Sequence, residues 1–304
     1  MTNSPPLAGI VAIPVTPFDQ QLNVDEQSLR RQVEFAINSG VSGLLANVNA
    51  SEWYALSDEE RLRTAEIIVG EAAGQLPVFI GVTAQSTIST IEFARHAEKI
   101  GASGVNSMPP PQLQLNEEGC AAFYSELSHA VDFPVILQNY YPPLGTPMTA
   151  QAIVRCASEL DNLRYVKEET PPEPIQISNL LSVLDKSGVV DGVFGGQGGI
   201  YLLDELQRGV SGNMPACHVG DVLTDVWDAW MRGDRGAAVR LYDRLLPLMV
   251  FERCYGGGQV YKGVLAHRGV IRFTGTRGGT NSLDDLAQQE LRRIISGIED
   301  LFRV

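Results

Sequence analysis

The feature that most constrains the fold of this 304-residue chain is a regular alternation of short apolar runs and helical segments. Each apolar run has the length of a buried strand, and such alternation is typical of parallel strands joined by crossover helices. Eight such units favour the α/β class, and within it a closed (β/α)8 TIM barrel over an open doubly wound sheet. The expected strands are residues 9–14, 42–46, 77–82, 102–108, 134–137, 163–166, 189–194 and 210–214.

The helices between these strands are expected at residues 25–38, 57–73, 87–100, 117–131, 149–160, 174–184 and 200–208. Ser57 and Glu60 have the spacing of a capping box, which marks the start of the second of them. Beyond residue 221 the pattern is entirely helical, with helices expected at residues 221–231, 235–253, 260–267 and 282–301. The first of these can serve as the eighth barrel helix. We therefore expect a barrel over residues 1–232 and a C-terminal helical extension over residues 233–304.

Chemistry in such barrels takes place at the C-terminal ends of the strands, and the sixth expected strand ends in Lys167. The chain has only four lysines, and Lys167 comes directly off an apolar run. Withdrawal from water disfavours the charged ammonium, so a lysine in this position presents a neutral, nucleophilic amine. Such an amine forms a Schiff base with a carbonyl substrate. The alternative interpretation is that Lys167 ends the strand and pairs with a glutamate.

Composition and motifs argue against several other functions. The net charge of −13 disfavours binding to nucleic acids and anionic membranes, because phosphate groups are neutralised by basic surfaces. No glycine motif for a dinucleotide or a P-loop is placed after a strand, so no cofactor is expected. The four cysteines are far apart and lack histidines at ligand spacing, which predicts free thiols and no metal. Without a secretion-signal pattern or a long apolar run, a cytoplasmic protein is expected.

Several motifs together resemble the dihydrodipicolinate synthase / N-acetylneuraminate lyase family of Schiff-base barrels. They are GIVAIPVTPFD at residues 9–19, SEWYALSDEER at 51–61, PVILQN at 134–139, YVKE at 165–168 and GVSGNMP at 209–215. The resemblance covers nearly the whole chain, including the C-terminal helices. It implies that Lys167 is the Schiff-base lysine, that the partner is a small 2-oxo acid, and that the protein is a homo-oligomer, a tetramer or a dimer.

The sequence departs from the family pattern at positions that select the substrate. A family loop of glycine, two threonines, glycine and glutamate is replaced by VNASE, with Asn49 and Ala50 for the threonines and Ser51 for the second glycine. Backbone N–H groups survive these changes, so this loop is still expected to bind the substrate's carboxylate, without a threonine proton relay. The tyrosine that ends strand five in the family aligns with Gln138. A glutamine amide forms hydrogen bonds but carries no proton near neutral pH, and nearby Tyr140 is a possible substitute.

These departures resemble one branch of the family, the 2-keto-3-deoxy-arabonate dehydratase-like proteins, which remove water from a short 2-oxo-3-deoxy sugar acid. In the implied reaction Lys167 condenses with the C2 ketone, the iminium acidifies C3, and the enamine expels the C4 hydroxyl. The proton for the departing oxygen can come from a water held by Gln138, from Tyr140 or from Tyr141. The sequence leaves these three alternatives open. Alternatives are a pyruvate-dependent aldolase or condensing synthase, a deaminase of a hydroxylated pyrroline carboxylate, and a barrel that binds a keto acid without turnover.

Other polar residues near the expected site receive weaker assignments. Gly196 and Gln197 lie in a glycine-rich loop where the backbone can approach a substrate closely. Glu52 is expected to support its loop, and Glu168 to point away from the site, because side chains alternate along a strand. Lys262, in the extension, is expected on a solvated helix.

Overall fold

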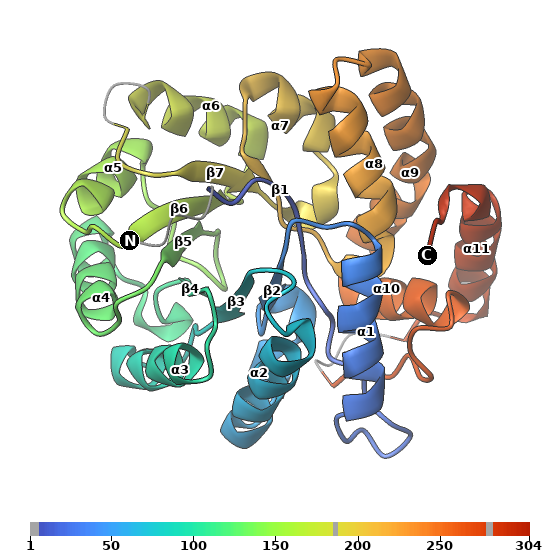
Figure 1. Cartoon of the computed structure of the whole chain (residues 1–304), viewed down its shortest axis with the longest axis horizontal. Coiled ribbons are helices and arrows are strands. Elements are labelled where there is room, and N and C mark those ends of the chain that lie inside the picture. The colour runs from blue at the N-terminus through green and yellow to red at the C-terminus, as the bar shows by residue number, and fades with distance from the viewer. Residues whose placement is uncertain (1–5, 185–187, 278–281) are drawn as a thin grey trace.

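The computed structural model describes residues 6–184, 188–277 and 282–304, and it forms a closed barrel of eight parallel strands (Figure 1). Each strand pairs with its neighbour in sequence, and β8 pairs with β1. The strands are β1 (Gly9–Ala12), β2 (Gly43–Ala46), β3 (Val78–Gly81), β4 (Gly104–Ser107), β5 (Val135–Asn139), β6 (Leu163–Glu168), β7 (Gly192–Gly195) and β8 (Gly212–Asn213). The predicted (β/α)8 barrel is therefore confirmed.

A ring of helices alternates with the strands and covers the outside of the barrel. The helices are α1 (Glu26–Asn38), α2 (Asp58–Ala72), α3 (Thr87–Lys99), α4 (Glu117–His129), α5 (Ala150–Ser158), α6 (Glu173–Leu184), α7 (Leu202–Arg208) and α8 (Gly220–Met231). The capping box predicted for α2 is present: the Ser57 hydroxyl accepts from the Glu60 N–H, and the Glu60 carboxylate accepts from the Ser57 N–H. This pairing satisfies N–H groups that the first turn of a helix leaves without partners.

Some element boundaries differ from those predicted. β8 has two residues where five were expected, although the flanking Ser211 and Met214 N–H groups still donate to the Val193 and Gly195 carbonyls of β7. The last helix was expected over residues 282–301. The structure has α11 (Asp285–Ser296), capped by Asp284 and ended at Gly297, and then a separate 3-10 turn (Glu299–Leu301).

The interior of the barrel is filled by side chains at its N-terminal end. Phe79, Tyr165 and Phe194 meet edge to face, with ring centroids 6.1 and 6.0 Å apart, and the Tyr165 hydroxyl accepts from the Leu7 N–H at 3.1 Å. Aromatic edge-to-face packing of this kind is favourable beyond the area it buries. Within the barrel interior formed by the described residues, space for a ligand therefore lies near the C-terminal ends of the strands.

The C-terminal extension consists of α9 (Arg235–Tyr255), α10 (Gly257–His267) and α11, drawn in orange to red in Figure 1. α9 packs on α7 and α8, while α10 contacts the 3-10 turns Asn49–Ser51 and Cys217–Val219, which follow β2 and β8. The extension therefore reaches the loops at the C-terminal end of the barrel, where the chemistry of such barrels takes place.

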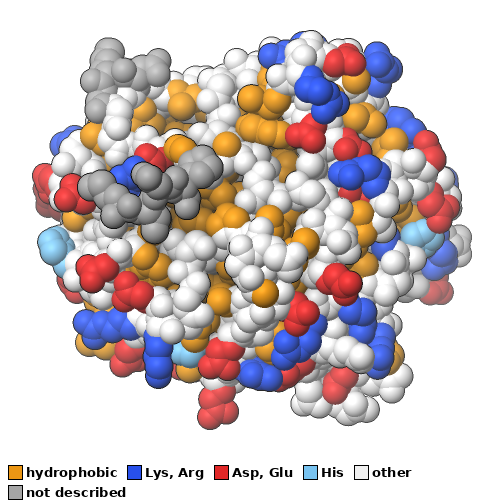
Figure 2. Space-filling model, viewed as in Figure 1, with side chains coloured by type: hydrophobic (Ala, Val, Ile, Leu, Met, Phe, Trp, Pro, Cys, Tyr) orange, Lys and Arg blue, Asp and Glu red, His pale blue; other side chains and the backbone are white. Residues whose placement is uncertain are grey.

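Acidic and basic side chains are mixed around the rim of the face drawn in Figure 2.

The four cysteines are free thiols, as predicted, and three of them are buried. Within residues 6–184, 188–277 and 282–304, no helix combines the length and apolar character needed to cross a bilayer. The same described residues contain no cluster of three His, Cys, Asp or Glu side chains arranged to hold a metal ion.

Candidate active site

The C-terminal ends of the strands surround a cavity of about 280 Å³. Ligand cavities are roughly 300–1,000 Å³, so this one suits a small molecule. One wall comes from the ends of β5 and β6 and the turn after β7, and the opposite wall from the turn after β2. The end of α9 and the start of α10 complete the enclosure. Its polar and charged lining residues are Asn49, Glu52, Tyr54, Gln138, Tyr140, Lys167, Glu169, Gln197, Glu252, Arg253 and Tyr261.

Lys167 lies in this cavity and is 3% exposed. Its Nζ is 3.2 Å from Oε2 of Glu169, which is also buried. Both side chains lie on the same side of the chain, because residues two apart in a strand point to the same face. The amine and the carboxylate are therefore within reach of direct proton transfer, in a site largely shielded from water.

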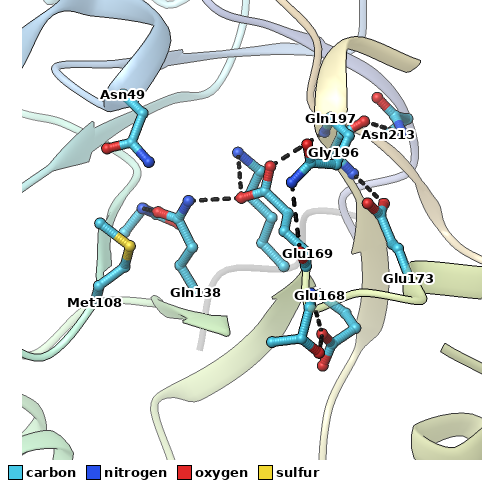
Figure 3. Close-up of polar contacts among 12 residues, drawn as sticks. Asn49, Met108, Gln138, Glu168, Glu169, Glu173, Gly196, Gln197 and Asn213 are labelled. Carbon is cyan, nitrogen blue, oxygen red and sulfur yellow. Dashed lines mark hydrogen bonds and ion pairs between the residues drawn. The ribbon is translucent and has the colours of Figure 1, made fainter. Parts of the chain in front are cut away.

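Gln138 stands beside Lys167 in the parallel pairing of β5 and β6. Its Oε1 accepts a hydrogen bond from the Asn106 amide at 2.7 Å, and its Nε2 donates to Glu169 Oε2 at 2.6 Å (Figure 3). The Asn106 contact fixes the orientation of the Gln138 amide, because the Gln138 oxygen must face the Asn106 donor. Gln138 thus holds the carboxylate that contacts the lysine.

The loop after β7 holds the other oxygen of Glu169. The Gln197 N–H donates to Glu169 Oε1 at 3.1 Å. Gly196 approaches so closely that a Cβ on it would lie 2.1 Å from that oxygen, so a side chain at this position would displace the carboxylate. The absence of a side chain at Gly196 therefore allows this loop to contact the Glu169 carboxylate.

Behind this loop lie the buried carboxyl groups of Glu173 and Glu205, and within the described residues Glu173 Oε2 and Glu205 Oε1 have no hydrogen-bond donor. Glu173 Oε1 accepts from the Gly196 N–H at 3.0 Å, and Glu205 Oε2 accepts from the Asn213 amide at 2.7 Å. Burial raises the pKa of Glu205 to about 7 and that of Glu173 well above its usual value. Because two neighbouring buried carboxylates repel each other, this pair favours a protonated carboxyl group, and it supports the loop around Gly196.

The turn after β2 presents donors to the opposite side of the cavity. Asn49 and Ala50 line it, and the Asn49 Nδ2 is buried without a hydrogen-bond partner among the residues that the structure describes. The amide of Asn49 is fixed by its Oδ1, which accepts from the Trp53 indole N–H at 3.0 Å. Ser51 does not belong to the lining: its hydroxyl donates to the Pro14 carbonyl at 2.8 Å. Ser51 therefore anchors the turn from behind.

Tyr140 brings a phenol into the cavity, and its ring stacks on Tyr141 with centroids 4.5 Å apart. Burial, and the nearby negative charge of Glu169, raise the pKa of Tyr140. The phenol therefore stays protonated over the ordinary pH range and can donate a hydrogen bond or a proton. Tyr141 is not part of the lining in the described structure.

The sequence matches a family model, described as the dihydrodipicolinate synthetase family, over residues 6–298. The chain belongs to the dihydrodipicolinate synthetase family. The resemblance drawn from the motifs is thereby confirmed.

Relatives within this family carry different activities in their names. An L-2-keto-3-deoxyarabonate dehydratase from Azospirillum brasilense is 28% identical over 308 residues, which cover 99% of this chain and 97% of the relative. A 4-hydroxy-tetrahydrodipicolinate synthase from Chloroherpeton thalassium is 28% identical and covers 87% of each chain. The crystal structure of dihydrodipicolinate synthase from Rhodopseudomonas palustris has a TM-score of 0.88 at 29% identity, over 95% of this chain and 97% of that one.

Against this family background, the cavity brings together most of the residues singled out from sequence. Lys167, Gln138, Tyr140, Asn49, Ala50 and Gln197 line it, whereas Ser51 and Gly196 lie just behind its surface. Their assignment as functional residues stays a prediction. Glu168 points away from Glu169 in Figure 3 and accepts hydrogen bonds from the Asn139 amide and the Thr170 N–H.

Glu169 was not identified from the sequence, although a signal for it exists. The alternation that turns Glu168 away from the site returns the next residue to the side of Lys167. Glu252, from α9, was missed as well, because the sequence does not show where the extension packs.

The expectation that Lys262 lies on a solvated helix is wrong. Lys262 is fully buried, and its Nζ donates to Glu52 Oε1 at 2.5 Å and to the Gly275 carbonyl at 2.7 Å. The Arg277 N–H donates to the other oxygen of Glu52 at 2.9 Å. Glu52 has a left-handed backbone (φ 56°), and these contacts hold it in place. The surroundings of Glu52 thus agree with its expected supporting role.

Proposed function

We propose that the protein is a Schiff-base lyase that removes water from a short 2-keto-3-deoxy sugar acid. The observation that carries the proposal is the contact between the Lys167 amine and the Glu169 carboxylate inside the cavity. An amine and an adjacent carboxylate are the two groups that elimination next to a ketone requires. The similarity to a protein named L-2-keto-3-deoxyarabonate dehydratase supports the same reaction.

The first step is formation of an iminium at C2 of the substrate. Glu169 takes a proton from the Lys167 ammonium, and the neutral Nζ adds to the ketone carbon. Glu169 returns that proton to the hydroxyl of the resulting carbinolamine, which leaves as water, and the remaining C=N⁺ bond draws electrons from C3. The substrate's carboxylate is proposed to bind at the turn after β2, where the Asn49 Nδ2 is a buried donor with no partner in the described part of the chain.

The second step is the elimination itself. Glu169 removes a proton from C3 to give an enamine, and the electron pair of the enamine expels the C4 hydroxyl. That oxygen leaves as water with a proton from Glu169 or from the Tyr140 phenol. Hydrolysis of the unsaturated iminium releases the product and frees Lys167. No carbon–carbon bond breaks, and no base has to deprotonate the C4 hydroxyl.

A pyruvate-dependent aldolase or condensing synthase is the second candidate, and the Tyr140 phenol in the cavity wall favours it. The Chloroherpeton thalassium relative is named as a synthase. Aldol cleavage, however, begins with removal of the C4 hydroxyl proton. Because the pKa of Tyr140 is raised, its phenolate is a scarce acceptor for that proton. Dehydration makes less demand on Tyr140 and is therefore preferred.

Borohydride trapping tests the covalent step. The protein is incubated with pyruvate or a 2-keto-3-deoxy pentonate, reduced with borohydride and weighed by intact-mass spectrometry. We expect an adduct with the wild type and none with Lys167→Ala, because the variant lacks the amine that forms the Schiff base. Lys99→Ala, on the exposed surface of α3, is the matched control and should trap like the wild type. Equal trapping by Lys167→Ala would reject the proposal.

Product analysis then separates the two candidate reactions. Turnover of a 2-keto-3-deoxy pentonate should give 5-hydroxy-2-oxopent-3-enoate, which becomes a 2-oxo acid semialdehyde, through its enol, when a proton moves from C5 to C3, without free pyruvate. Pyruvate together with a two-carbon aldehyde would instead identify an aldolase.

A further inference from the structure

Two buried ionisable side chains at the edge of the cavity take no part in the reaction described above. Glu252, near the end of α9, lines the cavity and is 6% exposed. Its Oε1 is 2.6 Å from Nε2 of His218, which is fully buried in the 3-10 turn after β8. The Tyr261 ring lies over the His218 ring, with centroids 4.8 Å apart. The histidine thus holds one carboxylate oxygen from behind.

The second oxygen of Glu252 faces the loop after β7. Gly198, another lining residue, has a backbone φ of 70°, and a Cβ on it would lie 3.3 Å from Glu252 Oε2. The missing side chain leaves room in front of this oxygen. A glutamate is rarely buried unless its oxygens are satisfied, and His218 satisfies only Oε1. Oε2 is therefore an acceptor available to a ligand's hydroxyl group.

The position of Glu252 in the cavity determines which part of a substrate it meets. A 2-oxo acid with its carboxylate at Asn49 and its C2 at Lys167 has its remaining carbons toward the other walls. Glu252 and Gly198 stand there, contributed by α9 and the loop after β7. The hydroxyl groups beyond C3 would lie next to them.

We propose that Glu252, positioned by His218, is a specificity-determining residue that accepts a hydrogen bond from a distal hydroxyl group of the substrate. The proposal rests on the proposed function and names its substrate class. These are 2-oxo acids that carry a hydroxyl group on C5, the carbon next to the one that loses its hydroxyl group. A site built to bind a hydroxyl group discriminates strongly against an analogue that lacks it, because a buried charged acceptor is then left unpaired.

The test compares two substrates that differ in one hydroxyl group. They are a 2-keto-3-deoxy pentonate and its 5-deoxy counterpart, 4-hydroxy-2-oxopentanoate, each measured by kcat/KM. We expect the wild type to favour the hydroxylated substrate about tenfold or more. The preference should shrink several-fold in Glu252→Gln, which loses the charge, and vanish in Glu252→Met, which cannot accept a hydrogen bond. A ratio of two kcat/KM values does not depend on how much of a variant is folded.

Glu34→Gln, on the exposed outer surface of α1, is the matched control and should keep the wild-type ratio. An unchanged ratio in both Glu252 variants, or a wild-type ratio near one, would overturn the inference and leave Glu252 and His218 as a hydrogen-bonded pair inside the protein. Failure of the proposed function has a different signature, namely no borohydride adduct and no turnover of either substrate by the wild type.

Discussion

The Glu169 carboxylate contacts three groups around the candidate nucleophile: the Lys167 amine, the Gln138 amide and the Gln197 N–H. These contacts separate two roles, positioning of the carboxylate and proton transfer. Gln138 donates to Glu169 but is neither a general acid nor a general base near neutral pH, so proton transfer is left to the carboxylate. A glutamine at this position is therefore compatible with elimination.

Replacement of Glu169 by glutamine tests whether this carboxylate is the proton carrier. The substitution keeps the shape of the side chain and removes the proton carrier, so kcat should fall about 10²–10⁴-fold, the usual contribution of general acid–base catalysis. Borohydride should still trap an adduct on Lys167 after long incubation. Glu168→Gln is a matched control one residue away, turned from the cavity, and steady-state kinetics should show a far smaller loss. Undiminished kcat in Glu169→Gln would exclude it as the proton carrier.

The sequence predicts that Lys167 and Gln138 lie at the C-terminal end of the barrel, because each residue stands at the end of an expected strand. It does not predict that Ser51 turns its hydroxyl to the Pro14 carbonyl, away from the cavity. That orientation depends on a 3-10 turn whose geometry is set by contacts with distant segments. Local spacing therefore identifies the loop that forms the wall but not which of its side chains face the ligand.

Whole elements also position the site, and the clearest case is α10. The buried pair of Lys262 and Glu52 connects this helix to the turn that carries Asn49, and burial lowers the pKa of Lys262. The sequence predicts α10 as a helix, although it begins at Gly257 rather than at residue 260. It does not predict that α10 packs on the turn after β2, because that contact joins Lys262 to Glu52, 210 positions earlier in the chain.

Substitution of Lys262 by methionine should loosen that connection. Removal of one partner leaves the Glu52 carboxylate buried with less compensation, which typically costs about 3–5 kcal/mol in the free energy of unfolding. We expect a lower stability in denaturant and a raised KM, because the turn after β2 carries Asn49, the proposed donor to the substrate's carboxylate. Lys99→Met, an exposed lysine on α3, should change neither. A raised KM should be partly recovered by adding Glu52→Gln; unaltered stability and KM in Lys262→Met would contradict the argument.

The whole molecule should respond to pH through the Glu173 and Glu205 pair. Burial raises the pKa of Glu205 to about 7 in the folded protein, above the ordinary value of 4.5. Between these two values the folded chain keeps a proton that the unfolded chain has lost, so the free energy of unfolding decreases as pH rises through this window. The contribution is fully present below the ordinary pKa and is lost as pH passes the raised one.

Glu205→Gln removes this titration while keeping a group that can hydrogen-bond to Glu173. Urea unfolding at a series of pH values from 5 to 8 should therefore show a smaller fall in stability for the variant than for the wild type. Glu34→Gln, whose side chain is exposed on α1, should follow the wild-type curve. Because the pair supports the Gly196 loop and through it Glu169, loss of stability toward pH 8 should be accompanied by a fall in kcat. Parallel pH curves for the wild type and Glu205→Gln would show that the two carboxyl groups do not share a proton.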